Sequence, residues 1–405
     1  MTKVAIMGYG TVGSGLIELI DKNRENNNTD IYITSILVKD KDECLGLEHY
    51  EIITDNVEEF FNHESEVIVE LIGGVDPAFH YVKRALENKK HVVTANKDLI
   101  AAHGEELFKL ATLNNVSLKF EAAVGGGIPI IKPITETLAG NEINSIKAIL
   151  NGTTNFILTK MDKEGLSYDE ALKEAQRLGF AEANPESDVM GYDAARKLAI
   201  LSTLAFNKKL DWKELNVEGI INIDEKDFEY AKKYDCKIKL LGQAIKSKCG
   251  IHASVKPVLV KNDSAFANIN NEVNIVVLDG PECGELSFIG KGAGKLPTGS
   301  AVYGDLNDIV KGRYSKITAF SEEKVECNFY SNATCNCIVR VSTTSKETVV
   351  EKFREFFNNM KVIDKSFNDE VAVHIECTSE AYVEKFIKTI STDEGIISYS
   401  KVVFI

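Results

Sequence analysis

The sequence predicts an α/β protein with three parts: a doubly wound parallel sheet, a mixed α+β domain and a C-terminal βαββαβ domain. Short apolar strands alternate with helical patterns in the first third, the middle is less regular, and a second alternation occupies the C-terminal part. The chain has 405 residues, which at about 150 residues per domain is enough for two or three domains with their own cores.

The first domain is predicted over residues 1–129. Its strands are expected at Lys3–Met7, Ile31–Val38, Val67–Leu71, His91–Thr94 and Ser117–Ala122. Its helices are expected at Val12–Arg24, Val57–Asn62, Ala78–Asn88 and Glu105–Asn114. Because parallel strands need crossover connections, which are usually helices, this alternation favours a doubly wound parallel sheet.

The second domain is predicted over residues 130–315 and mixes both kinds of element. Helices are expected at Ile130–Leu138, Asn155–Glu164, Tyr168–Leu178, Asp193–Phe206 and Ala301–Val310. Strands are expected at Ile143–Leu150, Lys237–Ile245, Ile251–Leu259 and Val273–Leu278. The polar, weakly patterned stretch Arg313–Lys324 is interpreted as a linker.

The third domain is predicted over residues 325–405. In order, the chain predicts a strand, a helix, two strands, a helix and a strand, at Cys337–Ser342, Lys346–Asn358, Val362–Asn368, Glu370–Cys377, Ser379–Ile390 and Ile397–Phe404. The order βαββαβ is typical of ferredoxin-like domains.

The composition excludes several classes of protein. The net charge is −14, from 47 basic and 61 acidic residues, whereas proteins that bind nucleic acids or anionic membranes present basic faces. No apolar run reaches the ~20 residues that span a bilayer, and the sequence opens on a strand-like segment rather than a signal peptide. The eight cysteines form no CxxC pair, so we expect no structural zinc and a reduced, cytoplasmic protein.

The glycines Gly8, Gly10 and Gly13 follow the first strand and lead into the first helix. In a GxGxxG loop the first glycine permits a tight turn, the second lets the backbone approach a pyrophosphate, and the third allows close packing of helix and strand. The amides of the helix N-terminus then bind the phosphates. This context indicates a Rossmann-type dinucleotide site, which includes Thr11 and Val12 of the same motif.

The end of the second strand bears on the choice of cofactor. An acidic residue there binds the ribose 2′-hydroxyl of NAD, whereas a cation accommodates the 2′-phosphate of NADP. Lys39 is the first charged residue after the strand and favours NADP, while Asp40 leaves NAD open.

Four further segments are candidates for the site. Lys97 follows His91–Thr94 at the carboxyl edge of the sheet, where open α/β sheets bind ligands, although a solvated surface lysine has the same pattern. The turn Gly125–Gly127 suits an anion, a monovalent cation or a hinge, and the sequence alone favours the hinge. Asn151–Asn155 is either a helix cap or a polar wall of a cleft. Gly290–Thr298 is either a second loop near the cofactor or an interdomain connection.

The segment from Gly179 to Lys197 is the most informative. Glu182 and Asp188 lie in irregular polar stretches. Asp193 and Lys197 are four residues apart on the following helix and share a face that continues with apolar residues, which indicates partial burial, although a solvated ion pair has the same spacing. If the pair is buried, desolvation lowers the pKa of Lys197 and Asp193 raises it, as suits a proton-transfer group.

Six motifs occur in the order GYGTVG, VTANK, EAAVGGGIP, NGTTN, GFAEANPESDVMGYDAARK and GKGAGKLPTG. Together they resemble homoserine dehydrogenase over residue 1 to about residue 315, and the C-terminal part is similar to an ACT module, a domain that senses amino acids. The resemblance implies NAD(P)-dependent interconversion of L-aspartate 4-semialdehyde and L-homoserine, in the threonine, methionine and isoleucine branch of amino-acid biosynthesis. The alternatives are another amino-acid dehydrogenase and a nucleotide- and amino-acid-binding sensor without turnover.

The resemblance also implies roles for individual residues. Proton transfer is assigned to Lys197. Substrate binding is assigned to Glu182, Asp188, Asp193 and Lys97. Cofactor contacts beyond the glycine loop and Lys39 are assigned to Thr94, Lys97, Gly179 and Gly292. A monovalent cation such as sodium is assigned, mainly through the backbone, to Glu121, Val124, Gly126 and Ile128.

In the implied reduction, the cofactor delivers hydride to the aldehyde carbon, protonated Lys197 protonates the developing alkoxide, and Glu182 fixes the substrate ammonium. Asn184 and Met190 depart from the family pattern, which usually has aspartate at the first and an acidic or polar residue at the second. Thr343–Ser345 replaces the Asp-Pro-Gly turn common in ACT domains. The implied partners are the two small-molecule substrates, an amino-acid effector such as L-threonine, and further copies of the chain in a homodimer or homotetramer.

Overall fold

The computed structural model describes residues 1–26, 28–247, 250–314, 317, 334–363, 367 and 369–405. The chain divides into two compact units that interleave along the sequence. The first unit contains Met1–Ile146, Arg196–Glu214 and Val273–Val325, and the second contains Lys147–Ala195, Leu215–Glu272 and Glu326–Ile405. None of the helices among the described residues is long and apolar enough to cross a membrane.

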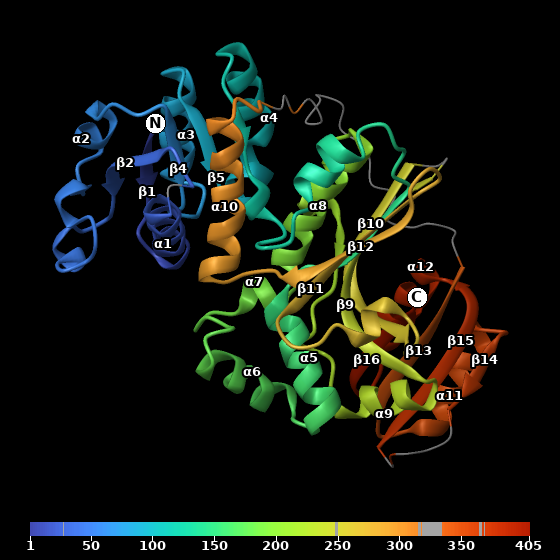
Figure 1. Cartoon of the computed structure of the whole chain (residues 1–405). Helices are drawn as coiled ribbons and strands as arrows, with labels where there is room; N and C mark the ends of the chain where they lie inside the picture. The colour runs from blue at the N-terminus through green and yellow to red at the C-terminus, as the bar shows by residue number, and fades with distance from the viewer. Residues whose placement is uncertain (27, 248–249, 315–316, 318–333, 364–366, 368) are drawn as a thin grey trace. The chain divides into compact units, whose positions relative to one another are not determined.

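The first unit is built on a six-stranded sheet with the order β3-β2-β1-β4-β5-β6, in which all pairs are parallel (Figure 1). Its strands are β1 Thr2–Met7, β2 Ile31–Leu37, β3 Ile53–Thr54, β4 Val67–Glu70, β5 His91–Thr94 and β6 Leu118–Lys119. The strand order reverses direction between β1 and β4, so the predicted doubly wound sheet is confirmed. Such a reversal opens a crevice at the carboxyl ends of the two strands, which is where open α/β sheets bind ligands.

The helices of this unit are α1 Thr11–Glu25, α2 Val57–Asn62, α3 Ala78–Glu87, α4 Lys97–Leu113 and α10 Lys295–Val310. Helix α4 begins at Lys97 rather than at the expected Glu105 because Asn96 caps it, its side chain accepting the backbone N–H of Leu99 at 3.0 Å. Helix α10 packs on α1 although the two are far apart in sequence (Figure 1). A Cβ on Gly15 of α1 would lie 2.3 Å from the Lys295 carbonyl oxygen, so this close approach needs glycine.

The first unit also contains an antiparallel hairpin of β11 Val273–Gly280 and β12 Gly284–Lys291. Strand β12 was not expected, because its glycines and alternating exposed residues hide the apolar pattern of a strand. A short π-helical segment at Pro133–Thr137 lies within the helix expected at Ile130–Leu138. The remaining short helical turns are Asp42–Cys44, Tyr50–Ile52, Glu121–Ala123, Trp212–Glu214 and, in the second unit, Ala265–Asn268.

In the second unit a mixed sheet runs in the order β7-β9-β10-β16-β13-β15-β14, with β8 beside β10. The strands are β7 Ser145–Ile149, β8 Asn216–Val217, β9 Cys236–Ser247, β10 Gly250–Lys261, β13 Thr334–Thr343, β14 Met360–Val362, β15 Glu370–Ser379 and β16 Ile396–Phe404. The helices are α5 Gly152–Glu164, α6 Tyr168–Arg177, α7 Glu186–Val189, α9 Glu225–Lys233, α11 Lys346–Phe356 and α12 Glu380–Ile390, together with the start of α8 Tyr192–Phe206.

Strands β13 to β16 have the spatial order β16-β13-β15-β14 and pair antiparallel throughout. With α11 and α12 they form the expected ferredoxin-like arrangement, here called the C-terminal module (residues 334–405). Strand β16 also pairs with β10 through Val258 and Val403, so the module continues the sheet of the middle region, which the sequence did not indicate. The linker expected at Arg313–Lys324 and the end of the strand expected at Val362–Asn368 lie largely outside the described residues.

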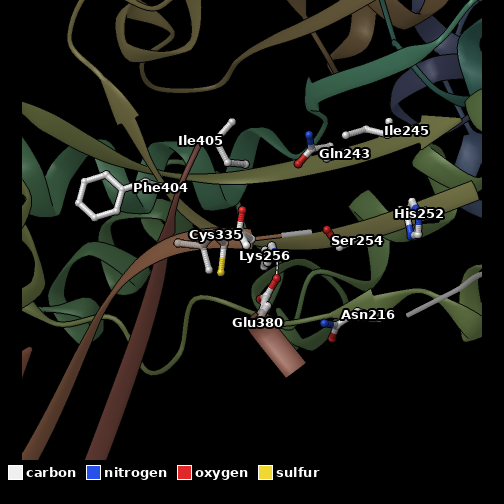
Figure 2. A pocket seen from close by; sticks show the side chains of 13 residues that line it. Asn216, Gln243, Ile245, His252, Ser254, Lys256, Cys335, Glu380, Phe404 and Ile405 are labelled. Atoms are coloured by element: carbon white, nitrogen blue, oxygen red, sulfur yellow. Dashed lines mark hydrogen bonds and ion pairs between the residues drawn. The ribbon is translucent and has the colours of Figure 1, made fainter. Parts of the chain in front are cut away.

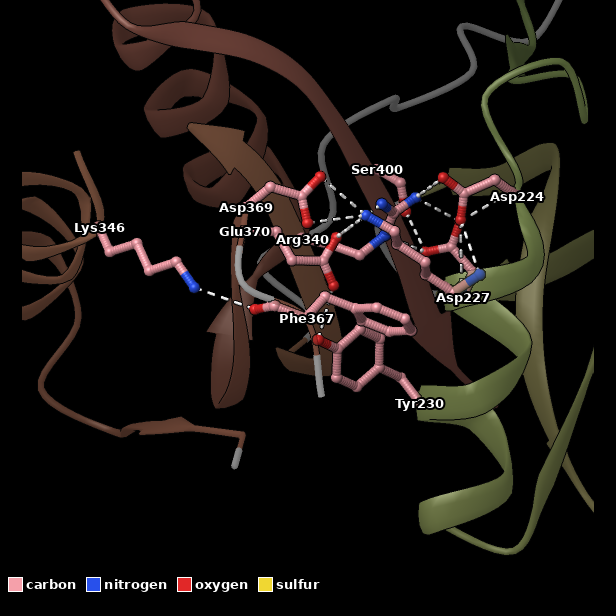
Figure 3. A network of polar contacts seen from close by, with 10 residues as sticks. Asp224, Asp227, Tyr230, Arg340, Lys346, Phe367, Asp369, Glu370 and Ser400 are labelled. Atoms are coloured by element: carbon pink, nitrogen blue, oxygen red, sulfur yellow. Dashed lines mark hydrogen bonds and ion pairs between the residues drawn. The ribbon is translucent and has the colours of Figure 1, made fainter. Parts of the chain in front are cut away.

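A buried charge network joins the C-terminal module to helix α9, an element that the sequence did not predict (Figure 3). Arg340 of β13 donates from Nε and Nη2 to Asp227 of α9 at 3.1 and 3.0 Å, and from Nη1 to Glu370 of β15 at 3.0 Å. The Ser400 hydroxyl donates to Asp227 at 2.5 Å, and the Tyr230 hydroxyl donates to Glu370 at 2.7 Å. Burial raises the pKa of Asp227, and Arg340 opposes that shift, so the ion pair and its hydrogen bonds make the burial of charge tolerable.

Candidate active site

The loop between β1 and α1 shows why it needs three glycines. Gly8 has a φ of +106°, and a Cβ there would lie 2.7 Å from the carbonyl oxygen of Leu71. A Cβ on Gly13 would lie 2.1 Å from the carbonyl oxygen of Gly8. Gly10 instead borders open space, and no side chain caps α1, so the first amides of the helix are directed at that space. A pyrophosphate fits this arrangement, because its oxygens accept helix N-terminal N–H groups.

A cavity of about 630 Å³ lies beside this loop, at the carboxyl ends of β1, β2 and β4. The charged side chains that line it are those of Lys39, Asp40, Glu43 and Asp55. Asp40 also accepts the backbone N–H of Asp42 at 2.9 Å, which fixes its carboxylate in a local turn. The cavity therefore contains one cation and three carboxylates near the predicted ribose position.

A buried glutamate at the end of β4 organises the next part of the crevice. Glu70 is fully buried and accepts the backbone N–H groups of Ile72 and Gly73 at 2.9 and 3.1 Å. Its other oxygen accepts the Thr94 hydroxyl at 2.6 Å, and the same hydroxyl accepts the backbone N–H of Asn96 at 2.9 Å. Burial raises the pKa of Glu70 while these donors lower it. These hydrogen bonds fix the start of α4. In the sequence, the only indication of them is that an acidic residue, Glu70, ends an apolar strand.

Lys97 is the first residue of α4 and comes just after β5, so it lies at the carboxyl edge of the sheet, as predicted. Its ammonium lies 3.9 Å from Asp98 Oδ2, while Asp98 Oδ1 lies 3.2 Å from Nε of Arg196. The Arg196 guanidinium stacks over the ring of Trp212 at 4.5 Å from its centroid. Asp98 therefore joins the N-terminus of α4 to the part of α8 that carries Arg196 and Lys197, a link that the sequence did not reveal.

The sequence alone favours a hinge at Gly125–Gly127, whereas the structure shows this segment packed against neighbouring backbone. The Glu121 carboxylate accepts the backbone N–H groups of Ile130, Ile131 and Lys132 at 2.6, 2.7 and 2.9 Å. Gly126 has a φ of +56°, and a Cβ there would lie 2.3 Å from the carbonyl oxygen of Gly292. The two glycine-rich loops therefore pack directly on each other, backbone against backbone.

The other residues assigned to the cation are buried beside this contact. Val124 and Ile128 are 1% and 2% exposed, and the Glu121 carboxylate is occupied by the amides that it caps. Asp305 of α10 accepts the backbone N–H of Glu121 at 2.8 Å, and burial followed by the charge of Glu121 raises the pKa of Asp305 to about 7. Among the described residues no group of three or more histidine, cysteine or acidic side chains is arranged to hold a metal.

In the second unit, Asn151 brings two of the predicted carboxylates together. Its Nδ2 donates to Asp188 Oδ1 at 2.8 Å and to Asp193 Oδ2 at 2.9 Å. Its Oδ1 accepts the backbone N–H of Thr154 at 2.8 Å and so caps α5. The helix cap that the sequence offered as one alternative is therefore confirmed, and the other end of the same amide bridges two carboxylates.

The other predicted residues of this part of the chain lie on α8 and in the segment after α6. Asp193 is buried in the first turn of α8, and Lys197, one turn further, is half-buried. Gly179 ends α6 with a φ of +78°, a conformation that favours glycine, so its local role is to end the helix. The Glu182 side chain is exposed and has no hydrogen bond or ion pair with any other described residue.

Two family models match the chain. Residues 129–307 match the homoserine dehydrogenase model, and residues 8–121 match the homoserine dehydrogenase NAD-binding domain. A homoserine dehydrogenase from Bacillus subtilis is 42% identical over 332 residues, which cover 79% of this chain and 75% of that protein. The chain belongs to the homoserine dehydrogenase family.

Solved structures of the family agree with this assignment. A homoserine dehydrogenase from Thiobacillus denitrificans is 32% identical, and the match covers 100% of this chain and 98% of that one with a TM-score of 0.89. A hyperthermophilic archaeal homoserine dehydrogenase in complex with NADPH is 29% identical, with coverage of 78% and 99% and a TM-score of 0.67. The activity is therefore NAD(P)-dependent interconversion of L-homoserine and L-aspartate 4-semialdehyde, and the resemblance drawn from the motifs is confirmed.

Proposed function

We propose that Lys197 is the acid–base group of the homoserine dehydrogenase reaction and that Asp188, Asp193 and Glu182 hold the amino-acid substrate. The observation that carries this proposal is the Asn151 amide, which holds the carboxylates of Asp188 and Asp193 at 2.8 and 2.9 Å. Asp193 is one helical turn before Lys197 on α8, so fixing the first residue also fixes the start of the helix that presents the second.

The proposed roles follow from charge and proton balance. The bound nicotinamide cofactor supplies the hydride in the reductive direction and accepts it in the oxidative one. Protonated Lys197 donates a proton to the alkoxide that develops from the aldehyde, and its neutral amine removes the hydroxyl proton of homoserine in reverse. The exposed Glu182 is available to the substrate ammonium, whose fixation aims the reacting carbon. Lys97 supplies positive charge at the sheet edge, where its ammonium lies 3.9 Å from Asp98 Oδ2.

The Lys197→Ala variant tests this assignment. General acid–base groups contribute about 10²- to 10⁴-fold, so we expect kcat to fall by at least about tenfold in both directions. Lys208→Ala is the matched control, because Lys208 is an exposed lysine after the end of the same helix. Reduction of the semialdehyde that persists within about tenfold of wild type in Lys197→Ala would show that another group transfers the proton.

For the cofactor we propose a preference for NADP(H), with NAD(H) also accepted. Lys39 supports it, because it is the cation in the cavity beside the glycine loop, while Asp40, Glu43 and Asp55 in the same lining oppose a 2′-phosphate. Lys39→Ala should raise KM for NADP more than KM for NAD, and Asp40→Ala should do the reverse. Equal changes for both cofactors in both variants would contradict the proposal.

We propose further that the backbone around Glu121, Val124, Gly126 and Ile128 binds a monovalent cation such as sodium. The support is the compact turn at Gly126, where backbone groups are packed without intervening side chains. Activity at constant ionic strength should then be higher in sodium chloride than in tetramethylammonium chloride, whose cation is too large for such a turn. Equal activity in both salts would count against a cation at this turn.

The C-terminal module is proposed to regulate the enzyme in response to an amino acid such as L-threonine, in a homodimer or homotetramer. Its ferredoxin-like order supports this by analogy with ACT modules. Because β16 pairs with β10 and Arg340 neutralises Asp227, the test should use the full chain rather than a truncation. Light scattering gives the oligomeric state, and initial rates with and without L-threonine show whether the effector acts.

A further inference from the structure

A short segment of the second unit, residues 216–220, consists of β8 and the three residues that follow it. Strand β8 pairs in parallel with β10, where Asn216 is opposite Ser254 and Val217 is opposite Val255. The Glu218 backbone N–H then donates to the Val255 carbonyl oxygen at 2.7 Å. The backbone of the segment is therefore fixed to β10, while its other groups contact further elements.

The end of the 216–220 segment contacts the turn that joins α7 to α8, residues 189–191. The Ile220 backbone N–H donates to the Val189 carbonyl oxygen at 2.8 Å. A Cβ on Gly219 would lie 2.3 Å from the same oxygen, so only glycine permits this approach. The segment and the turn therefore pack backbone against backbone, and a shift of one requires a shift of the other.

This turn connects the two carboxylates that the Asn151 amide bridges. Asp188 is in α7 before the turn, and Asp193 is in the first turn of α8 after it. The Gly191 backbone N–H donates to the Asp188 carbonyl oxygen at 2.9 Å, and the Gly191 carbonyl oxygen accepts the Ala195 backbone N–H at 2.9 Å. The position of the turn therefore sets the positions of both carboxylates.

The 216–220 segment also contacts α12 of the C-terminal module through Asn216. Asn216 lines a cavity with Lys256 of β10 and Glu380 of α12, which form an ion pair with each other (Figure 2). Its Nδ2 donates to Oε1 of Glu384, which is one turn further on α12, at 3.5 Å. This distance is long for a hydrogen bond, so Asn216 contributes little to the attachment.

The stronger contact with the C-terminal module is the ion pair of Glu218 with Lys401 of β16. Their charged atoms are 3.6 Å apart, and the Lys401 side chain is 5% exposed. Burial lowers the pKa of Lys401, but the charges of Glu218 and Glu380 outweigh burial and raise it overall. Burial raises the pKa of Glu218, and the charge of Lys401 opposes that shift. Lys401 also lies 2.8 Å from Glu380 and 3.1 Å from Glu384, so α12 fixes the ammonium that attracts Glu218.

We propose that Glu218 and Lys401 are positioning residues that place the carboxylates of Asp188 and Asp193 for substrate binding, through the 216–220 segment. The ion pair fixes the segment, the segment supports the turn, and the turn sets the two carboxylates. This inference rests on the proposed role of those carboxylates in holding the amino-acid substrate. It gives the C-terminal module a part in building the substrate site that requires no effector.

Steady-state kinetics of the full-length enzyme test the proposal. Glu218→Gln removes the charge and keeps the shape of the side chain. We expect KM for homoserine to rise by about three- to tenfold, as for the loss of one contact between coupled groups, while kcat and KM for the cofactor stay within about twofold. A purely structural defect would instead lower kcat with the amount of folded protein and leave KM unchanged. Glu229→Gln is the matched control, because Glu229 is an exposed glutamate of α9.

Variants of Lys401 show whether the two residues act through one contact. Lys401→Met should raise KM for homoserine at least as much as Glu218→Gln, and the double variant should raise it no further than Lys401→Met alone. Lys401→Arg keeps the charge, so its KM should stay within about threefold of wild type. Additive effects in the double variant, or a KM in Lys401→Arg equal to that of Lys401→Met, would contradict an ion pair that positions the segment.

Gly219→Ala tests the segment without changing a charge. Its Cβ would lie 2.3 Å from the Val189 carbonyl oxygen, so the turn must move. Because a displacement of about 1 Å can cost about 10²-fold, we expect kcat/KM for homoserine to fall by about 10- to 100-fold. Gly140→Ala is the control, because its Cβ would meet no atom within 4 Å. An unchanged KM for homoserine in Glu218→Gln refutes the proposal, whether or not Gly219→Ala folds.

Asp188→Asn separates this proposal from the proposed function. If Asp188→Asn raises KM for homoserine and Glu218→Gln does not, the carboxylate binds substrate and the 216–220 segment does not position it. If Glu218→Gln raises KM and Asp188→Asn does not, the proposed binding role of Asp188 is wrong, and so is the route from the segment through this carboxylate. A rise in both variants supports both proposals.

Discussion

The Asn151 amide gives the sharpest test of how the site is built. Its carbonyl oxygen caps α5 through Thr154, and its Nδ2 bridges Asp188 and Asp193. Asn151→Asp keeps an oxygen for the cap but replaces the bridging donor with a third carboxylate. Asn151→Ala removes both functions, and Asn151→Ser keeps a capping hydroxyl without the reach of the amide. The three variants therefore separate the cap from the bridge.

The magnitudes follow from the bonds that each variant loses. A hydrogen bond to a charged group contributes about 1.5–3 kcal/mol, and about 1.4 kcal/mol corresponds to tenfold in rate. Asn151→Ser loses both bonds of Nδ2, and the loss of even one predicts a fall in kcat/KM for homoserine of at least about 10- to 100-fold. The fall should be larger in Asn151→Asp, where three carboxylates meet. A lost N-cap costs about 1 kcal/mol, so Asn151→Ala should be less stable than Asn151→Ser by about that amount.

Steady-state kinetics and urea unfolding check these values. Because the bridge positions the carboxylates that we propose to bind the substrate, KM for homoserine should rise while KM for the cofactor changes little. A general loss of folded protein would not produce this split. The reasoning is refuted if folded Asn151→Asp retains kcat/KM within about threefold of wild type. It is also refuted if all three variants lose activity only in proportion to their loss of stability.

Three other perturbations test the remaining contacts. Gly126→Ala places a Cβ in a left-handed turn, 2.3 Å from a carbonyl oxygen. We expect its free energy of unfolding, measured in urea, to fall by about 1–3 kcal/mol. Gly140→Ala is the control and should be close to wild type, because the space around its Cβ is open. Burial raises the pKa of Asp305 to about 7, so its proton is held more tightly in the folded state and its contribution to stability is lost as pH rises from about 4 to about 7. The free energy of unfolding of Asp305→Asn, relative to that of wild type, should therefore increase between pH 5 and pH 8. A relative decrease over this range would show that Asp305 is not the group responsible. Arg340→Met leaves Asp227 as a buried charge without its main partner. The free energy of unfolding, measured by heat or urea, should then fall by about 3–5 kcal/mol. A fall of less than about 1 kcal/mol would mean that water solvates the network.

Much of the fold and part of the site could be predicted from local sequence, because their signals are local. The apolar strands and amphipathic helices of the first domain have the periodicity of the elements that they form. The spacing of Gly8, Gly10 and Gly13 indicates a tight turn between a strand and a helix, in which side chains would collide with the backbone at Gly8 and Gly13. The same is true of the βαββαβ order at the C-terminus, which the antiparallel order of β13 to β16 bears out. Asp193 and Lys197 were predicted to share a helix face because helix geometry places residues four apart on one side, and both do lie on α8.

What only the tertiary structure decided involves groups that are distant in sequence. Asn151 meets Asp188 and Asp193 across 37 and 42 residues, and Arg340 meets Asp227 across 113. Gly126 needs glycine because the Gly292 backbone packs against it, and Gly292 needs glycine because the Asn274 side chain packs against it, which neither loop reveals alone. Local patterns report the preference of a residue for a helix, strand or turn, whereas the partner that a buried charge or amide finds depends on how strands pair and helices pack. The sequence by itself determined the kinds of element and the chemistry available at their ends, and the tertiary structure decided which of those groups meet.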